Sequence, residues 1–67
     1  MNNTGSQSCL ESIRKTTYHY YSLKGKSAKY AQLYNTWQSC LEVAEEIYHS
    51  DAPDAEERIK ALKLAIL

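Results

Sequence analysis

Apolar side chains recur every three or four residues through the middle of this chain, and that spacing constrains the fold more than any other feature. The period matches one face of an α-helix, and polar side chains occupy the opposite face. The apolar stripe consists of Tyr30, Leu33, Trp37, Cys40, Ala44 and Ile47. No stretch of the chain shows the period-two alternation that is typical of β-strands. The sequence therefore predicts a helix over residues 27–49, with Ser27 as its N-cap.

Shorter stripes of the same period lie on both sides of this helix. The upstream stripe predicts a helix over residues 7–23, which Ser6 or Ser8 would cap and Gly25 would end. The downstream stripe predicts a helix over residues 53–66. The upstream stripe is Leu10, Ile13, Thr17 and Tyr20, and the downstream stripe is Ala55, Ile59, Leu62 and Ile66.

Short connections make successive helices antiparallel neighbours. We therefore expect an all-α fold, an antiparallel helical hairpin plus a shorter third helix, which together form a small three-helix bundle. The 67 residues make one domain, 1–67, with residues 1–6 as a flexible start. A chain of this length buries only roughly 60% of the surface that its unfolded form exposes. Two cysteines are too few for a fold stabilised by several disulfides. We therefore expect the chain to gain stability by self-association, as a homodimer or another homo-oligomer.

The sequence also restricts where such a protein would act. No apolar run approaches the roughly 18 residues that a membrane span requires. The first residues lack the basic segment and apolar stretch of a secretory signal. We therefore expect a cytoplasmic protein with reduced thiols and no membrane partner.

Two pairs of possible metal ligands are spaced wrongly for a shared ion. Cys9 and His19 are ten residues apart, and Cys40 and His49 are nine apart, whereas helical ligands lie three or four apart. No serine stands in a recognisable nucleophile motif with a histidine or an acid. The sequence therefore predicts no metal, no cofactor and no enzymatic activity.

A five-residue sequence occurs twice. Gln7-Ser8-Cys9-Leu10-Glu11 is repeated as Gln38-Ser39-Cys40-Leu41-Glu42. Two interpretations remain open: an ancestral duplication of a helix-turn unit about 30 residues long, or coincidence in a helical sequence of low variety.

Aromatic and basic residues alternate around the first predicted connection. The group that could contact a nucleic acid is Tyr18, Lys24, Lys26 and Lys29, since stacking and phosphate neutralisation together bind single strands. In the alternative interpretation, Tyr20, Tyr21 and Tyr30 belong to the core and the lysines solvate a turn. The second interpretation is the one we favour from the sequence.

The zero net charge conceals two opposed halves. Residues 1–30 carry five cations and one acid, for a net charge of +4, and residues 31–67 carry three cations and seven acids, for −4. A rod polarised in this way can pair antiparallel with its own copy.

The end of the third predicted helix has more aliphatic residues than one face can bury. Exposed apolar surface of this kind is typical of interaction sites. The predicted hydrophobic contributors to an interface are Trp37, Leu41, Leu62, Leu64, Ile66 and Leu67. The sequence thus predicts a non-enzymatic protein–protein interaction module, of the adaptor, inhibitor or co-chaperone type, that acts through helix–helix contacts. The alternative is a small nucleic-acid-binding regulator.

Overall fold

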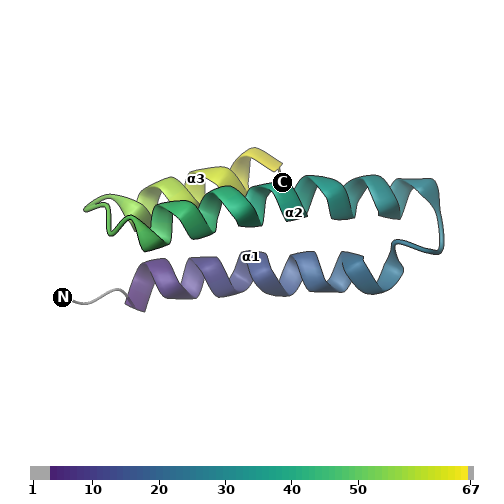
Figure 1. Ribbon diagram of the computed structural model, residues 1–67, viewed down its shortest axis with the longest axis horizontal. Coiled ribbons are helices and arrows are strands. Elements are labelled where there is room, and N and C mark those ends of the chain that lie inside the picture. The colour runs from purple at the N-terminus through teal and green to yellow at the C-terminus, as the bar shows by residue number, and fades with distance from the viewer. Residues whose placement is uncertain (1–3, 67) are drawn as a thin grey trace.

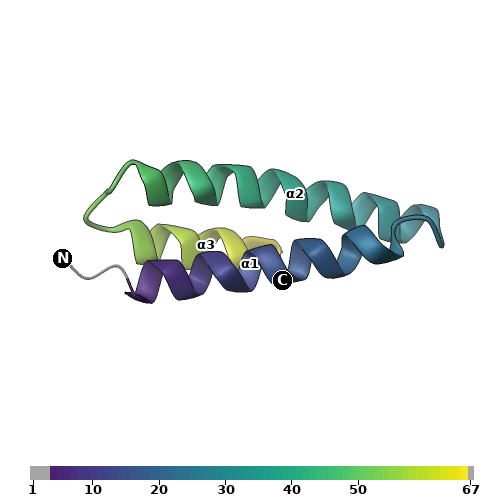
Figure 2. The ribbon, with the colours of Figure 1, turned by 60° about the horizontal axis from the view of Figure 1, so that its bottom comes forward.

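Three helices account for most of residues 4–66, the part of the chain that the computed structural model describes (Figure 1). Helix α1 spans Thr4–Leu23, α2 spans Ala28–His49 and α3 spans Ala55–Ile66, and these described residues contain no strand. Helices α1 and α2 form an antiparallel hairpin, and α3 folds back along it (Figure 2). The predicted all-α three-helix bundle is confirmed.

Helix α1 begins earlier than the apolar stripe indicates. Ser6 was expected to cap this helix or precede it, but it lies inside the helix and is 5% exposed. The reason is a tertiary contact, since the first turn of α1 packs on α3, with the Glu56 side chain directly against Gly5. Because this contact covers the first turn, packing extends the helix beyond the stripe.

The two connections differ in their use of backbone conformation. Ser27 caps α2 as predicted, with its hydroxyl oxygen accepting a hydrogen bond from the Tyr30 N–H at 3.2 Å. Gly25 lies in the turn after α1, but its φ is not positive, so this turn does not depend on glycine. After α2, in contrast, Asp51 adopts φ 60°, the left-handed conformation that favours glycine.

The core is made by the three predicted stripes. Ile13 of α1 and Ile59 of α3 are fully buried, and Trp37 of α2 is 3% exposed. The other buried apolar residues are Leu10, Cys40, Ala44, Ile47 and Ala55.

The buried residues are concentrated in the half of the hairpin that α3 covers. Helix α3 has only 12 residues, and it ends near the middle of the hairpin (Figures 1 and 2). No residue from 18 to 36 is fully buried. The result is a rod of 42 × 17 × 17 Å with a three-helix half and a two-helix half.

Candidate protein-binding groove

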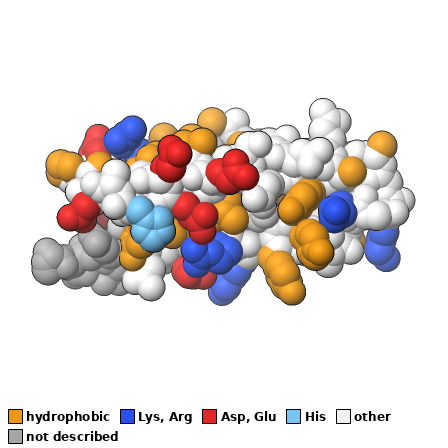
Figure 3. Space-filling view, in the orientation of Figure 1, with side chains coloured by type: hydrophobic (Ala, Val, Ile, Leu, Met, Phe, Trp, Pro, Cys, Tyr) orange, Lys and Arg blue, Asp and Glu red, His pale blue; other side chains and the backbone are white. Residues whose placement is uncertain are grey.

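An open groove lies between α1 and α2 on the face of the hairpin that α3 leaves uncovered. The groove has a volume of about 490 Å³. Its α1 wall includes Arg14, Lys15, Tyr18 and Tyr21, and its α2 wall consists of Tyr34, Gln38 and Leu41. Figure 3, seen from the same side as Figure 1, shows a group of hydrophobic side chains on the half of this face near the α1–α2 connection, and others along the edge of the other half. Acidic side chains gather on the other half.

Three tyrosines form the end of the groove near the α1–α2 connection. The rings of Tyr18 and Tyr21 are stacked, with centroids 6.2 Å apart and planes 11° apart. The Tyr34 ring is 5.6 Å from that of Tyr21. Tyr18 is 73% exposed and Tyr21 is 52% exposed, which leaves a broad aromatic surface in contact with water. Tyrosine is enriched in protein interfaces because its ring is apolar while its hydroxyl tolerates a wet rim.

A cation lies over this aromatic cluster. The Lys24 ammonium is 5.2 Å from the Tyr21 ring centroid and 5.5 Å from that of Tyr34. A cation within about 6 Å of a ring face is attracted by the ring quadrupole. Lys24 therefore places a positive charge at the aromatic end of the groove.

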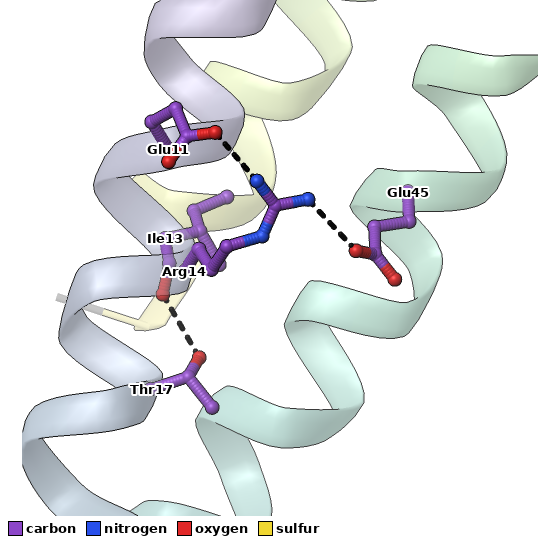
Figure 4. A network of polar contacts seen from close by, with 5 residues as sticks. All are labelled: Glu11, Ile13, Arg14, Thr17 and Glu45. Carbon is purple, nitrogen blue, oxygen red and sulfur yellow. Dashed lines mark hydrogen bonds and ion pairs between the residues drawn. The ribbon is translucent and has the colours of Figure 1, made fainter.

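A charged network forms the opposite end of the groove. The Arg14 guanidinium donates hydrogen bonds to Glu11 at 2.5 Å and to Glu45 at 3.0 Å, so it links α1 to α2 (Figure 4). The hydrogen bond that Arg14 donates to Glu45 raises the pKa of Arg14. Desolvation of the guanidinium opposes this rise, and the charge of Glu11 adds to it. The three side chains are each more than a third exposed, so each ion pair contributes at most about 1 kcal/mol to stability.

The floor of the groove contains a buried hydroxyl with its partners in place. Thr17 donates a hydrogen bond to the Ile13 carbonyl at 2.9 Å, and its oxygen lies 3.2 Å from the Trp37 carbonyl on α2 (Figure 4 shows the first contact). Among the described residues, every buried side-chain nitrogen or oxygen has a hydrogen-bond partner. The groove therefore offers an apolar surface and charges to a ligand, rather than a buried polar group.

The predicted interface residues are dispersed in the structure. Trp37 belongs to the core, because the apolar stripe of α2 turns it toward α1 and α3. Leu41 lies on the groove wall, whereas Leu62 and Ile66 of α3 pack partly against the core. Leu64 is 68% exposed on α3. The remaining predicted residue, Leu67, lies outside the described residues.

The sequence interpretation of the tyrosines is partly wrong. Tyr20 and Tyr30 are half-buried, but Tyr21, which was expected in the core, is exposed. A signal for the groove was present in the spacing. Arg14, Tyr18 and Tyr21 follow each other at four and three residues, as do Tyr34, Gln38 and Leu41, so each helix carries a second stripe beside the buried one. The predicted nucleic-acid contacts Tyr18, Lys24, Lys26 and Lys29 are all exposed around the α1–α2 connection.

The cysteines lie apart from the groove. Both are free thiols, Cys9 half-buried and Cys40 buried, and desolvation raises the pKa of Cys40. Within residues 4–66, no group of three or more histidines, cysteines and acids is placed to hold a metal ion. Over the same range, no helix combines the length and apolar character that crossing a membrane requires.

The repeated pentapeptide does not pack in the same way twice. In the first copy Leu10 is buried and Cys9 is half-buried, whereas in the second copy Cys40 is buried and Leu41 is half-buried. The two copies thus face the core with positions one residue apart, a rotation of about 100° on a helix. This rotation is what turns Leu41 toward the groove.

Comparison with known protein families, with curated proteins and with solved structures gave no match to this chain.

Proposed function

We propose that this protein is a non-enzymatic interaction module whose groove between α1 and α2 receives a helix of a protein partner. The observation that carries the proposal is the exposed aromatic surface of Tyr18 and Tyr21, which α3 leaves uncovered. A helix laid along two antiparallel helices buries an apolar stripe against both, which is a common mode of helix recognition. Leu41 on the groove wall extends that apolar surface toward the charged end.

The composition of the groove supports protein binding over catalysis. It is wide open, and the Arg14 guanidinium on its wall stays protonated and is already bound to Glu11 and Glu45. A general base or nucleophile needs a pKa suited to proton transfer or attack, together with a positioned partner. The cytoplasm is the proposed location, since the free thiols Cys9 and Cys40 suit a reducing compartment.

A photo-crosslinking residue in the groove tests this function. Benzoylphenylalanine replacing Tyr18 should yield crosslinks to a helical segment of a protein when the variant is expressed in the native host. The same probe replacing Val43, which is exposed but does not line the groove, is the matched control. Crosslinks that are absent from Tyr18, or equal at the two positions, would contradict the proposal.

One observation favours the alternative of nucleic-acid binding. The stacked pair of Tyr18 and Tyr21 beside Lys24 is an exposed aromatic platform flanked by a cation, on which a base of a single strand could stack. Lys26, exposed in the same connection, would neutralise a phosphate. Oligothymidylate binding that falls steeply with salt and is lost in Lys26→Glu would favour this alternative. Binding that is absent or insensitive to Lys26→Glu would eliminate it.

A further inference from the structure

The rod has opposite charges at its two ends. Residues 16–41, which contain the α1–α2 connection, carry three lysines and no acid, for a net charge of +3. The rest of the chain carries five cations and eight acids, for a net charge of −3. The rod is 42 Å long, and the Debye length at physiological salt is about 8 Å, so each end interacts with its surroundings separately.

From this polarity we infer that the occupant of the groove is a second copy of the same chain, lying antiparallel across it. The inference rests on the proposed function, because it identifies the partner of the groove described there. An antiparallel arrangement places the positive end of each copy against the negative end of the other. A parallel arrangement would bring like charges together at both ends, which is unfavourable. The two copies are then related by a two-fold axis, and the same contacts occur twice.

Gln38 marks the position of that axis. It lies between Tyr34 and Leu41 on the α2 wall of the groove. A side-chain amide has both a donor and an acceptor, so two copies of Gln38 can pair with each other across a two-fold axis. Tyr34 and Glu42 are each four residues from Gln38, about 6 Å along the helix at 1.5 Å per residue, so the axis brings Tyr34 of one copy level with Glu42 of the other.

This register pairs Lys24 with Glu42 of the other copy. Because the Lys24 ammonium lies over the Tyr34 ring, it arrives at the level of Glu42 together with that ring. Glu42 is exposed and accepts a hydrogen bond from Gln38, and no ion pair within the described chain involves it. Glu11 and Glu45, in contrast, are already bound to Arg14. Glu42 is therefore an acid of α2 that is available to a second copy at this level.

The apolar surfaces match in the same register. Leu41 is three residues beyond Gln38 and Tyr34 is four residues before it, so the aromatic end of each copy covers Leu41 of the other. The projected area of one face, the product of the 42 Å length and 17 Å width, is roughly 700 Å². A standard interface buries about 800 Å² per partner, so one face of the rod is of the size that a specific dimer requires. Helix α3 stays on the outside of this dimer.

A charge-exchange experiment tests the inference on the full chain. Sedimentation equilibrium at low salt should show a wild-type dimer, and Lys24→Glu and Glu42→Lys should each weaken dimerisation about tenfold or more, because each creates two like-charge contacts. An equimolar mixture of the two variants should restore dimerisation, since both pairs become attractive again in the heterodimer. Far-UV circular dichroism verifies that each variant keeps its helices.

The matched control moves the same charge to a lysine that lies away from the tyrosine rings. Lys29→Glu makes the same change at an exposed position of α2 that, among the described residues, has no contact with the Tyr21 or Tyr34 ring, and mixing it with Glu42→Lys should not restore dimerisation. A mixture of Lys24→Glu and Glu42→Lys that stays monomeric would overturn the inference, and so would equal restoration by Lys29→Glu.

The outcomes also separate this inference from the proposed function. A wild-type chain that stays monomeric at low salt, while the Tyr18 crosslinker captures a helix of a different protein, overturns the inference and leaves the proposed function standing. A monomeric chain that assembles only on oligothymidylate overturns the inference in favour of nucleic acid. Crosslinks from Tyr18 to a second copy of the chain support both.

Discussion

The left-handed backbone of Asp51 gives a stability prediction that the structure makes quantitative. With φ 60° directly after α2, Asp51 pays a steric cost that glycine does not, and we take this cost as about 1 kcal/mol. Its carboxylate also follows the C-terminus of α2, where the helix dipole disfavours an acid by about 0.3–1 kcal/mol. Asp51→Gly removes both costs, so the free energy of unfolding should rise by about 1–2 kcal/mol, or about 4–8 °C in Tm for each kcal/mol at this chain length.

Two further variants at this position separate the backbone effect from the charge effect. Asp51→Asn removes the charge but keeps a side chain that tolerates the left-handed region. Its free energy of unfolding should therefore rise only by the amount that the helix dipole costs the carboxylate. Asp51→Ala is also uncharged, but its Cβ has the full steric cost of the left-handed conformation. The free energy of unfolding of Asp51→Gly should therefore exceed that of Asp51→Ala by about 1 kcal/mol or more. Urea unfolding followed by circular dichroism at 222 nm measures all four chains at one concentration, because self-association makes stability concentration-dependent. Equal stability of the glycine and alanine variants would refute the reasoning.

Four other expectations follow from burial and backbone conformation. Gly25→Ala should raise the free energy of unfolding by about 0.4–1 kcal/mol, since φ is not positive there and an added Cβ meets no atom within 4 Å; a fall in Tm would contradict this. Ile13→Ala should lower the free energy of unfolding by about 2–5 kcal/mol, which is a large part of the total stability of a chain of this size. Val43→Ala, at an exposed position, should change it by no more than about 0.5 kcal/mol. Similar losses for the two variants in urea unfolding would count against the assigned core. At pH 8 a thiol reagent should modify Cys9 rapidly and Cys40 only upon unfolding, because Cys40 is buried and burial raises its pKa. Equally fast modification of the two thiols would disprove the burial of Cys40. Because the pKa of Cys40 is higher in the folded protein than in the unfolded chain, the neutral thiol contributes stability at pH values below the ordinary thiol pKa. This contribution to the free energy of unfolding should be lost as the pH rises through the pKa of the folded protein.

The buried half of the fold could be predicted because a single physical signal specifies it. The stripes that contain Ile13, Trp37 and Ile59 have helical spacing, and all three residues lie in the core. The start of α1 could not be predicted in this way. It depends on a contact between Gly5 and Glu56, residues 51 positions apart, and local spacing holds no information on such a contact.

The groove was harder to predict than the core. Its residues also follow helical spacing, but Tyr18, Tyr21 and Tyr34 are amphipathic, and their composition fits a core and a surface equally well. What decides between these positions is the side of the hairpin on which α3 packs. Helix α3 lies against Gly5 and Ser12 of α1, and the face that carries the three tyrosines stays uncovered. Trp37 is the opposite case. Tryptophan is enriched in interfaces, but here it is 3% exposed and belongs to the core cluster to which all three helices contribute.

The short reach of α3 also has a consequence for motion. The half of the rod that contains Ile13 and Ile59 is held by three helices, while residues 18–36 contain no fully buried side chain. Local opening costs least where few apolar contacts must be broken, so amide hydrogens should exchange in a gradient, fastest beside the α1–α2 connection and slowest beside α3. The tyrosines lie in the part of the rod that opens most readily. A partner bound to the tyrosines would suppress that opening, so the amide hydrogens of residues 18–36 should exchange more slowly when the partner is bound.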